Sequence, residues 1–183
     1  MPADREAFAE LDARYRRYLL LLSHAYVEPK LHRRLDLEGI VQQTLLEAWQ
    51  SAPDRAGWSI WLRRLLAHNL NDELRKARAE KRDAAREQSL EVGLAESSAR
   101  LGEFLAANQS SPSARINREE QALRVAIALD RLPPAQREAL ILQHWHGWTL
   151  AQIGEHLQRS AAAVAGLLKR GLRQLREELA EPE

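Results

Sequence analysis

The sequence predicts an all-α protein, and three observations support this prediction. Leu, Ala, Glu and Arg dominate the 183 residues, and all four are good helix formers. Hydrophobic residues make up 45% of the chain and aromatic residues only 5%, a composition typical of a helical protein with a core. In several segments the apolar residues recur every three or four positions, as on one face of a helix. We therefore expect helices that bury their apolar faces against one another.

Three helices are expected in the first part of the chain. Residues 3–27 carry apolar side chains at helical spacing, and Pro29 ends this helix. Asp36 is a good N-cap for a second helix that runs to about position 49. After the turn-rich segment SAPDRAG, a third helix begins near Trp58 and continues to about position 82. Three such helices can close a small core.

The helical periodicity weakens over residues 87–113, which we interpret as a linker. Its last residues, NQSSPS, favour turns and coil. A second periodic block follows, and it is broken at RLPPAQ and again at WHGW. We therefore expect two helical domains, residues 1–86 and residues 114–183, joined by a flexible connector.

Positive charge is concentrated in two short segments, although the net charge of the chain is only +1. Residues 61–86 carry 8 basic and 4 acidic groups, and residues 159–176 carry 5 basic groups and no acid. Both segments are suited to contact a phosphate backbone.

The segment TLAQIGEHLQRSAAAVAGLLKRG predicts a helix-turn-helix. Gly154 allows two short helices to approach closely, and Ser160 is a good N-cap for the second. Such a second helix enters the DNA major groove by its N-terminal end, where small side chains let the backbone approach the bases. Gln158 occupies the turn position where many such motifs have glycine, so a left-handed residue there would be mildly strained. The residues expected to contact DNA are Arg159, Ser160, Ala161, Ala162, Ala165, Lys169, Arg170 and Arg173.

Three motifs in order resemble the bacterial RNA polymerase sigma factors of the extracytoplasmic-function (ECF) type. They are LDLEGIVQQTLLEAW, then WLRRLLAHNLNDELRKARAEKR, and then the segment from LDRLPPAQ to LRQLREEL. The resemblance implies that the first binds core RNA polymerase, the second reads the minus-ten promoter element, and the third reads the minus-thirty-five element. It further implies a cytoplasmic protein that is not an enzyme, needs no cofactor and has polymerase and promoter DNA as partners. An anti-sigma factor remains open as a further partner.

The resemblance also assigns residues to these roles. The polymerase-facing positions would be Glu38, Gln42, Gln43 and Glu47. The minus-ten positions would be Asp54, Arg55, Arg64, His68, Asn69, Asn71, Asp72, Arg75 and Arg78, several of which form a polar stripe at helical spacing. The chain departs from the family at Gly39 and Gln43, where Asp and Glu are usual, and at His68, where Asn is usual.

Other readings of the sequence are weaker. Trp58 and Trp61 are expected in the core rather than stacked on bases, as are Trp145 and Trp148. Two neighbouring histidines, at positions 144 and 146, are too few for a metal site, and no catalytic motif is present. The chain has no cysteine, no apolar run long enough for a bilayer and no signal-peptide pattern at its start. A free-standing helix-turn-helix regulator is the alternative function, and a helical scaffold without a nucleic-acid role is the third.

Overall fold

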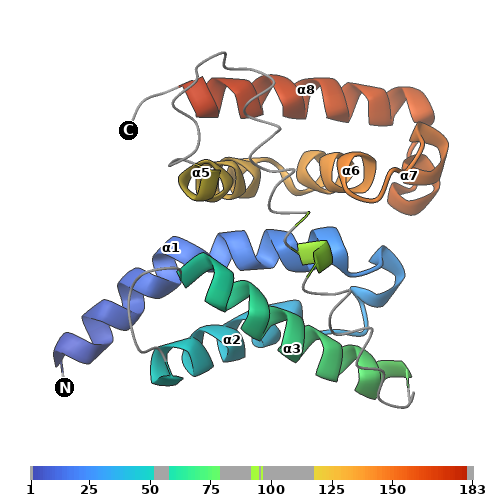
Figure 1. Cartoon of the computed structure of the whole chain (residues 1–183). Coiled ribbons are helices and arrows are strands. Elements are labelled where there is room, and N and C mark those ends of the chain that lie inside the picture. Colours follow the sequence, from blue (N-terminus) through green and yellow to red (C-terminus); the bar gives the residue numbers. More distant parts are fainter. Residues whose placement is uncertain (1, 52–57, 79–91, 95, 97–117, 181–183) are drawn as a thin grey trace.

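The computed structural model consists of two layers of helices (Figure 1). It describes residues 2–51, 58–78, 92–94, 96 and 118–180, and all secondary structure in these ranges is helical, which confirms the predicted all-α fold. One layer contains α1 (Pro2–Tyr26), the short 3₁₀ turn η1 (Pro29–Leu31), α2 (Leu37–Ser51) and α3 (Trp58–Arg78). The other layer contains α5 (Arg118–Arg131), α6 (Pro134–His144), α7 (Leu150–Leu157) and α8 (Ala161–Ala180). Among the described helices, none is both long and apolar enough to cross a membrane.

The helix boundaries follow local signals in the sequence. The carboxylate of Asp36 accepts a hydrogen bond from the backbone N–H of Gly39 (2.9 Å), so the predicted N-cap of α2 is confirmed. Pro29 stands at the start of η1, after α1 has ended. Pro134 opens α6, where its missing N–H costs no helical hydrogen bond.

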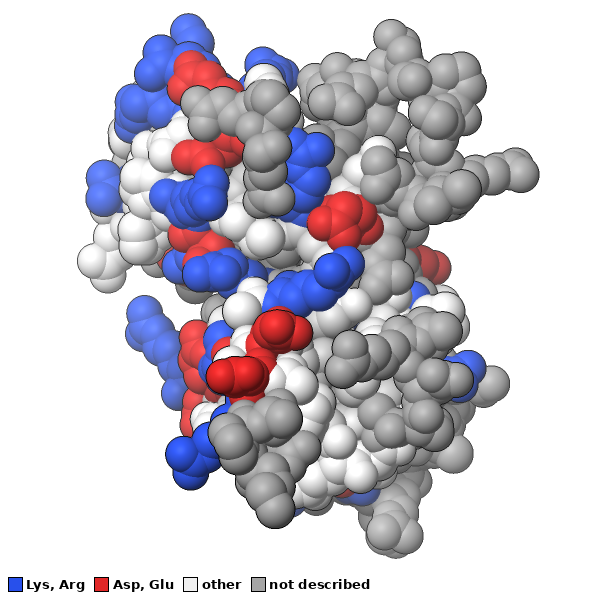
Figure 2. All heavy atoms as spheres, turned by 90° about the vertical axis from the view of Figure 1, so that its left-hand side faces the viewer, with Lys and Arg blue, Asp and Glu red and all other residues white. Residues whose placement is uncertain are grey.

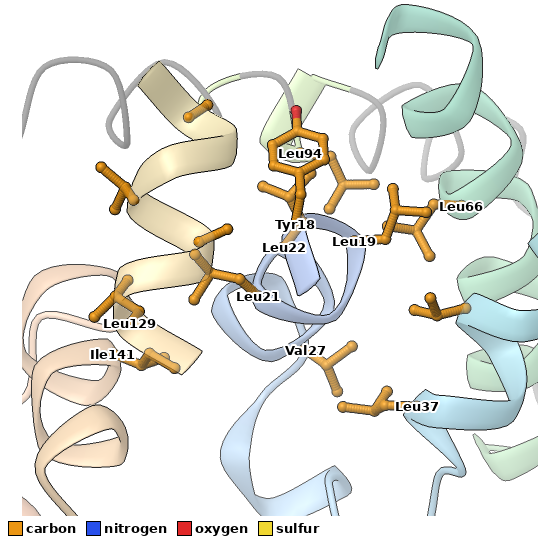
Figure 3. Packing of buried hydrophobic residues seen from close by; sticks show 14 of the residues in the cluster. Tyr18, Leu19, Leu21, Leu22, Val27, Leu37, Leu66, Leu94, Leu129 and Ile141 are labelled. Carbon is orange, nitrogen blue, oxygen red and sulfur yellow. The ribbon is translucent and has the colours of Figure 1, made fainter. Parts of the chain in front are cut away.

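Helix α1 belongs to the first layer but also packs against α5 and α6 of the other layer, and it is apolar on both sides (Figure 3). Leu19 points toward Leu66 of α3, whereas Leu21 points toward Leu129 of α5 and Ile141 of α6. All five side chains are buried, and they belong to one hydrophobic cluster that runs through both layers. The division into two domains stays a prediction, but the two parts of the chain share a core through α1.

A piece of the segment expected to be a linker is part of this core. Leu94 is fully buried, and Figure 3 places it beside Tyr18 and Leu22 of α1. A side chain at Gly93 would collide with the ring of Tyr26, so the chain passes very close to α1 here. Most of the predicted linker lies outside the described residues.

The tryptophans only partly follow the expectation that they fill the core. Trp58, Trp145 and Trp148 are partly buried and pack against the hydrophobic cluster. Trp61, in contrast, is 37% exposed, so its assignment to the core was wrong. Helix α3 buries the face centred on Leu62, and a neighbouring residue is rotated about 100° away from that face in an α-helix.

Candidate nucleic-acid interface

Helices α7 and α8 form a helix-turn-helix with a very tight turn. A Cβ atom on Gly154 would lie 2.6 Å from the backbone oxygen of Arg159, so only glycine fits without a shift of the backbone. The N–H of Arg159 in turn donates to the oxygen of Gly154 (2.8 Å). Gln158 adopts the left-handed conformation (φ 54°, ψ 48°), as the motif predicts. The turn therefore fixes the direction of α8 relative to α7.

Both helices of the motif begin with a side-chain cap. The hydroxyl of Ser160 accepts a hydrogen bond from the N–H of Ala163 (3.2 Å), which confirms the predicted cap of α8. Helix α7 begins with a capping box in which Thr149 and Gln152 bond to each other's backbone N–H groups. Our reading of the sequence missed this second cap, although the spacing of Thr149 and Gln152 is its usual signature.

Helix α8 has a buried face and a basic exposed face. Val164, Leu167 and Leu168 are buried against the rest of the layer. All eight residues expected to contact minus-thirty-five DNA are exposed, six on α8 and two just before it: Arg159, Ser160, Ala161, Ala162, Ala165, Lys169, Arg170 and Arg173. Because Ala161 and Ala162 have small side chains, the backbone at the start of α8 is accessible from outside.

The exposed face of α3 carries cations, but an acid lies among them. Arg64 and His68 are exposed one turn apart. Asp72 follows, with its carboxylate 3.6 Å from His68 Nε2 and 2.9 Å from an NH group of Arg75. The polar stripe predicted for this helix is therefore less positive than its count of basic residues indicates.

Two asparagines assigned to base contacts are not fully exposed in this structure. Asn71 is only 4% exposed, because it lies one turn after the buried Ala67 and thus on the core side of α3. Asn69 is half-buried, and its amide donates to Thr44 Oγ1 (3.1 Å) and to Glu47 Oε2 (2.9 Å). In this conformation the amide of Asn69 ties α3 to α2, and the side chain of Asn71 is buried. Residues Asp54 and Arg55 and the side chain of Arg78 lie outside what the structure describes.

Two of the four polymerase-facing positions, Gln43 and Glu47, line an acidic groove between α2 and α3. Glu38, Gln42 and Gln43 are exposed, and Gln43 donates to the half-buried Glu47 (2.7 Å). The groove has a volume of about 500 Å³, and its charged lining residues are Asp36, Glu47, Asp72, Glu73 and Lys76. Four carboxylates thus face one ammonium group, which is itself bound to Glu73 (2.6 Å). The groove is suited to a positively charged partner.

Gly39, where the family usually has Asp, also lines this groove. A Cβ atom at this position would lie 2.5 Å from a carboxylate oxygen of Asp36. The cap of α2 therefore occupies the space that a side chain at position 39 would need, and it places a negative charge there instead.

Histidines at the joint of the two layers are the feature that sequence reasoning missed. His24, His32 and His146 come from three separate segments, and their rings lie close together. No periodicity or motif connects them in the sequence, so only the packing of the layers shows the cluster. Within the described ranges, no group of three or more histidines or carboxylates is placed to hold a metal ion.

Comparison with known proteins agrees with this geometry. Residues 123–175, which include α6 and α7 and most of α5 and α8, match the family model "Sigma-70, region 4". The chain is also similar to the ECF RNA polymerase sigma factor SigG of two Mycobacterium tuberculosis strains, CDC 1551 / Oshkosh and ATCC 25618 / H37Rv. The identity is 32% over 196 aligned positions, which cover 95% of this chain and 50% of each relative. The chain thus spans about half the length of these relatives. Over 95% of its length the chain is thus similar to an ECF-type RNA polymerase sigma factor, and its residues 123–175 match sigma-70 region 4.

Proposed function

We propose that this protein binds core RNA polymerase and directs it to a particular set of promoters. In this proposal α2 contacts the polymerase, α3 engages the minus-ten element and the start of α8 enters the major groove at minus thirty-five. The protein performs no chemistry itself and acts in the cytoplasm, where core polymerase is found.

The observation that carries the proposal is the exposed start of α8. Alanines occupy the positions nearest the tight turn, and Lys169, Arg170 and Arg173 follow on the exposed side of the same helix. The positive end of the helix dipole adds to this charge at the N-terminus of α8. A helix of this kind can bring its backbone close to base edges while its cations bind phosphates on either side.

The acidic groove between α2 and α3 supports the polymerase contact. A basic helical partner would find carboxylates along this groove, and the loss of acids at positions 39 and 43 is offset by Asp36, Asp72 and Glu73. A free-standing DNA-binding regulator requires no contact with a basic protein partner. This distinction favours a sigma factor over the alternative.

Transcription in vitro tests the proposal directly. Core polymerase and a library of genomic promoter fragments should give initiation that depends on the added protein. If no fragment responds and no complex with core polymerase forms, the proposal fails. Tight binding to palindromic duplex DNA in a gel shift without polymerase would instead support the free-standing regulator.

A matched pair of variants on α8 tests the minus-thirty-five contact. Arg170 and Arg176 are both exposed arginines on this helix, but only Arg170 lies in the part expected to reach DNA. Arg170→Ala should reduce the steepness of a plot of log affinity for promoter DNA against log salt concentration by about 1, because one phosphate contact is lost. Arg176→Ala should leave the slope unchanged. An equal effect of both variants would show that α8 contributes only general positive charge.

A further inference from the structure

The joint between the two layers ends in a cluster of histidine rings. His24 belongs to α1, His32 follows η1, and His146 follows α6. The ring centroids of His24 and His32 are 4.9 Å apart, and those of His32 and His146 are 6.4 Å apart. His146 Nε2 also lies 3.0 Å from the backbone oxygen of His24, a hydrogen bond that links the layers.

Outside this cluster, polar contacts at the joint are exposed. Arg14 pairs with Glu120 (2.9 Å) and Arg17 pairs with Asp130 (3.0 Å), and each pair joins α1 to α5. Figure 2 shows basic and acidic side chains close together where the layers meet. Exposed ion pairs contribute little to stability, so the joint depends mainly on its apolar contacts and on the histidine cluster.

With its two layers packed together, the protein is too short to reach both promoter elements at once. Elements centred about 25 base pairs apart are separated by about 85 Å along B-form DNA, at about 3.4 Å per base pair. A compact chain of this length has a radius of gyration of about 16 Å, and hence a diameter of about 40 Å. The surfaces of α3 and α8 cannot both reach their elements while the layers stay packed on α1.

We propose that this structure is a closed state of the protein, held by the joint of α1 with α5 and α6, and that His24, His32 and His146 form a latch that must open before both promoter elements are bound. The inference rests on the proposed function for its biological role. The opening itself is a property of the chain alone and can be measured without polymerase.

The electrostatics of the cluster make closure depend on pH. Burial, together with the smaller effects of the neighbouring His32, Arg137 and His146, lowers the pKa of His24 to about 4. Burial also lowers the pKa of His32; its bond to the backbone oxygen of Val27 opposes this, as does the charge of Glu138, whereas His146 and His156 add to it. The closed state therefore holds both rings neutral near pH 7.

The sign and size of the effect follow from proton linkage. In an open state His24 would regain an ordinary pKa of about 6.5, so protons favour opening as the pH falls below that value. At pH 5.5 the shift of His24 alone increases the ratio of open to closed molecules about 10-fold. His32 acts in the same direction. Above about pH 7 the contribution to closure is complete.

Energy transfer between two dyes can measure this opening. The chain has no cysteine, so Ala13→Cys on α1 and Ala180→Cys on α8, both at exposed positions, provide two labelling sites. The ratio of open to closed molecules should increase about 10-fold or more between pH 7.5 and pH 5.5. The double variant His24→Gln/His32→Gln, which cannot take up these protons, should lose this response. Circular dichroism at both pH values checks that each helix remains folded.

Two results of this measurement would overturn the proposal. One is energy transfer that does not change with pH in the parent protein. The other is an equal change in the parent protein and in the double glutamine variant, since the latch would then play no part in opening.

A reversible crosslink tests whether opening is needed for function. Arg17→Cys and Asp130→Cys replace an exposed pair that bridges the joint, and a cleavable bis-maleimide can connect them. The crosslinked protein should support transcription from a promoter with both elements more than tenfold less well than the same protein after the linker is cleaved. The single variant Arg17→Cys, treated identically, should remain active.

The outcomes of this second test separate the two proposals. If the crosslinked protein is as active as the protein after linker cleavage, the proposal that the closed state must open is wrong. If neither form supports transcription but the dyes report pH-dependent opening, the latch stands and the proposed sigma-factor function fails.

Discussion

Two residues in or near the helix-turn-helix have a left-handed backbone conformation, and substitutions at them should change stability in opposite directions. Gln158 has φ 54° in the turn between α7 and α8, and Gly147 has φ 66° in the loop before α7. A Cβ atom at Gly147 would meet no heavy atom within 4 Å beyond its chain neighbours, so a substitution there changes little except the backbone energy. Gln158→Gly should relieve strain, whereas Gly147→Ala should introduce it.

The magnitudes follow from two opposing effects. A residue with a Cβ atom costs about 1–2 kcal/mol in the left-handed region. A glycine instead costs about 0.5–1 kcal/mol, because it loses more conformational freedom on folding. The free energy of unfolding should therefore rise by about 0.5–1 kcal/mol in Gln158→Gly and fall by about the same amount in Gly147→Ala.

Urea denaturation measures both changes. With a slope of about 2 kcal/mol per molar urea, the midpoint should move by about 0.3–0.5 M in each direction. Gln158→Ala serves as the control, because alanine keeps the Cβ atom and should bring no gain. If Gln158→Gly is no more stable than Gln158→Ala, the left-handed turn stores no strain and the reasoning is wrong.

Four further predictions concern single contacts. Ser160→Ala should lower the free energy of unfolding by about 1 kcal/mol through loss of the α8 cap, as measured by urea titration. Leu94→Ala should lower the free energy of unfolding by about 2–5 kcal/mol, as measured by thermal unfolding. Val92→Ala, at a 54% exposed position, should change this free energy by no more than about 0.5 kcal/mol. Equal effects of the two variants would contradict the burial of Leu94. Gly154→Ala should lower the free energy of unfolding by about 1–3 kcal/mol, because the new Cβ atom collides with the backbone of the turn. It should also abolish minus-thirty-five binding in a gel shift with polymerase, while the variant still pulls down core polymerase. The low pKa of His24, about 4 when folded, means that stability is greatest above about pH 6.5 and falls by up to about 3 kcal/mol as the pH approaches 4; a stability curve that stays flat over this range would rule out the effect.

The helices and their ends could be predicted because they depend on local signals. The cap at Asp36, the cap at Ser160 and the close approach at Gly154 are each encoded within a few residues, and the structure confirms all three. The apolar residues Val164, Leu167 and Leu168 recur at helical spacing, and they form the buried face of α8.

The errors arose where long-range packing decides the outcome. The polar side chain of Asn71 is buried, because α3 turns that position toward the core whatever its polarity. Leu94 joins the core although the segment around it has weak periodicity, since its burial depends on α1 rather than on its own neighbours in sequence.

The position of α1 has a consequence for work with fragments of this chain. Its apolar side chains serve both layers, so a piece comprising residues 1–86 would present Leu21 and its neighbours to water. Such a stripe favours self-association, and an isolated N-terminal piece should therefore precipitate or form oligomers unless the surface is made polar. Replacing Leu21 by a charged residue should make that piece easier to purify while it weakens the intact protein.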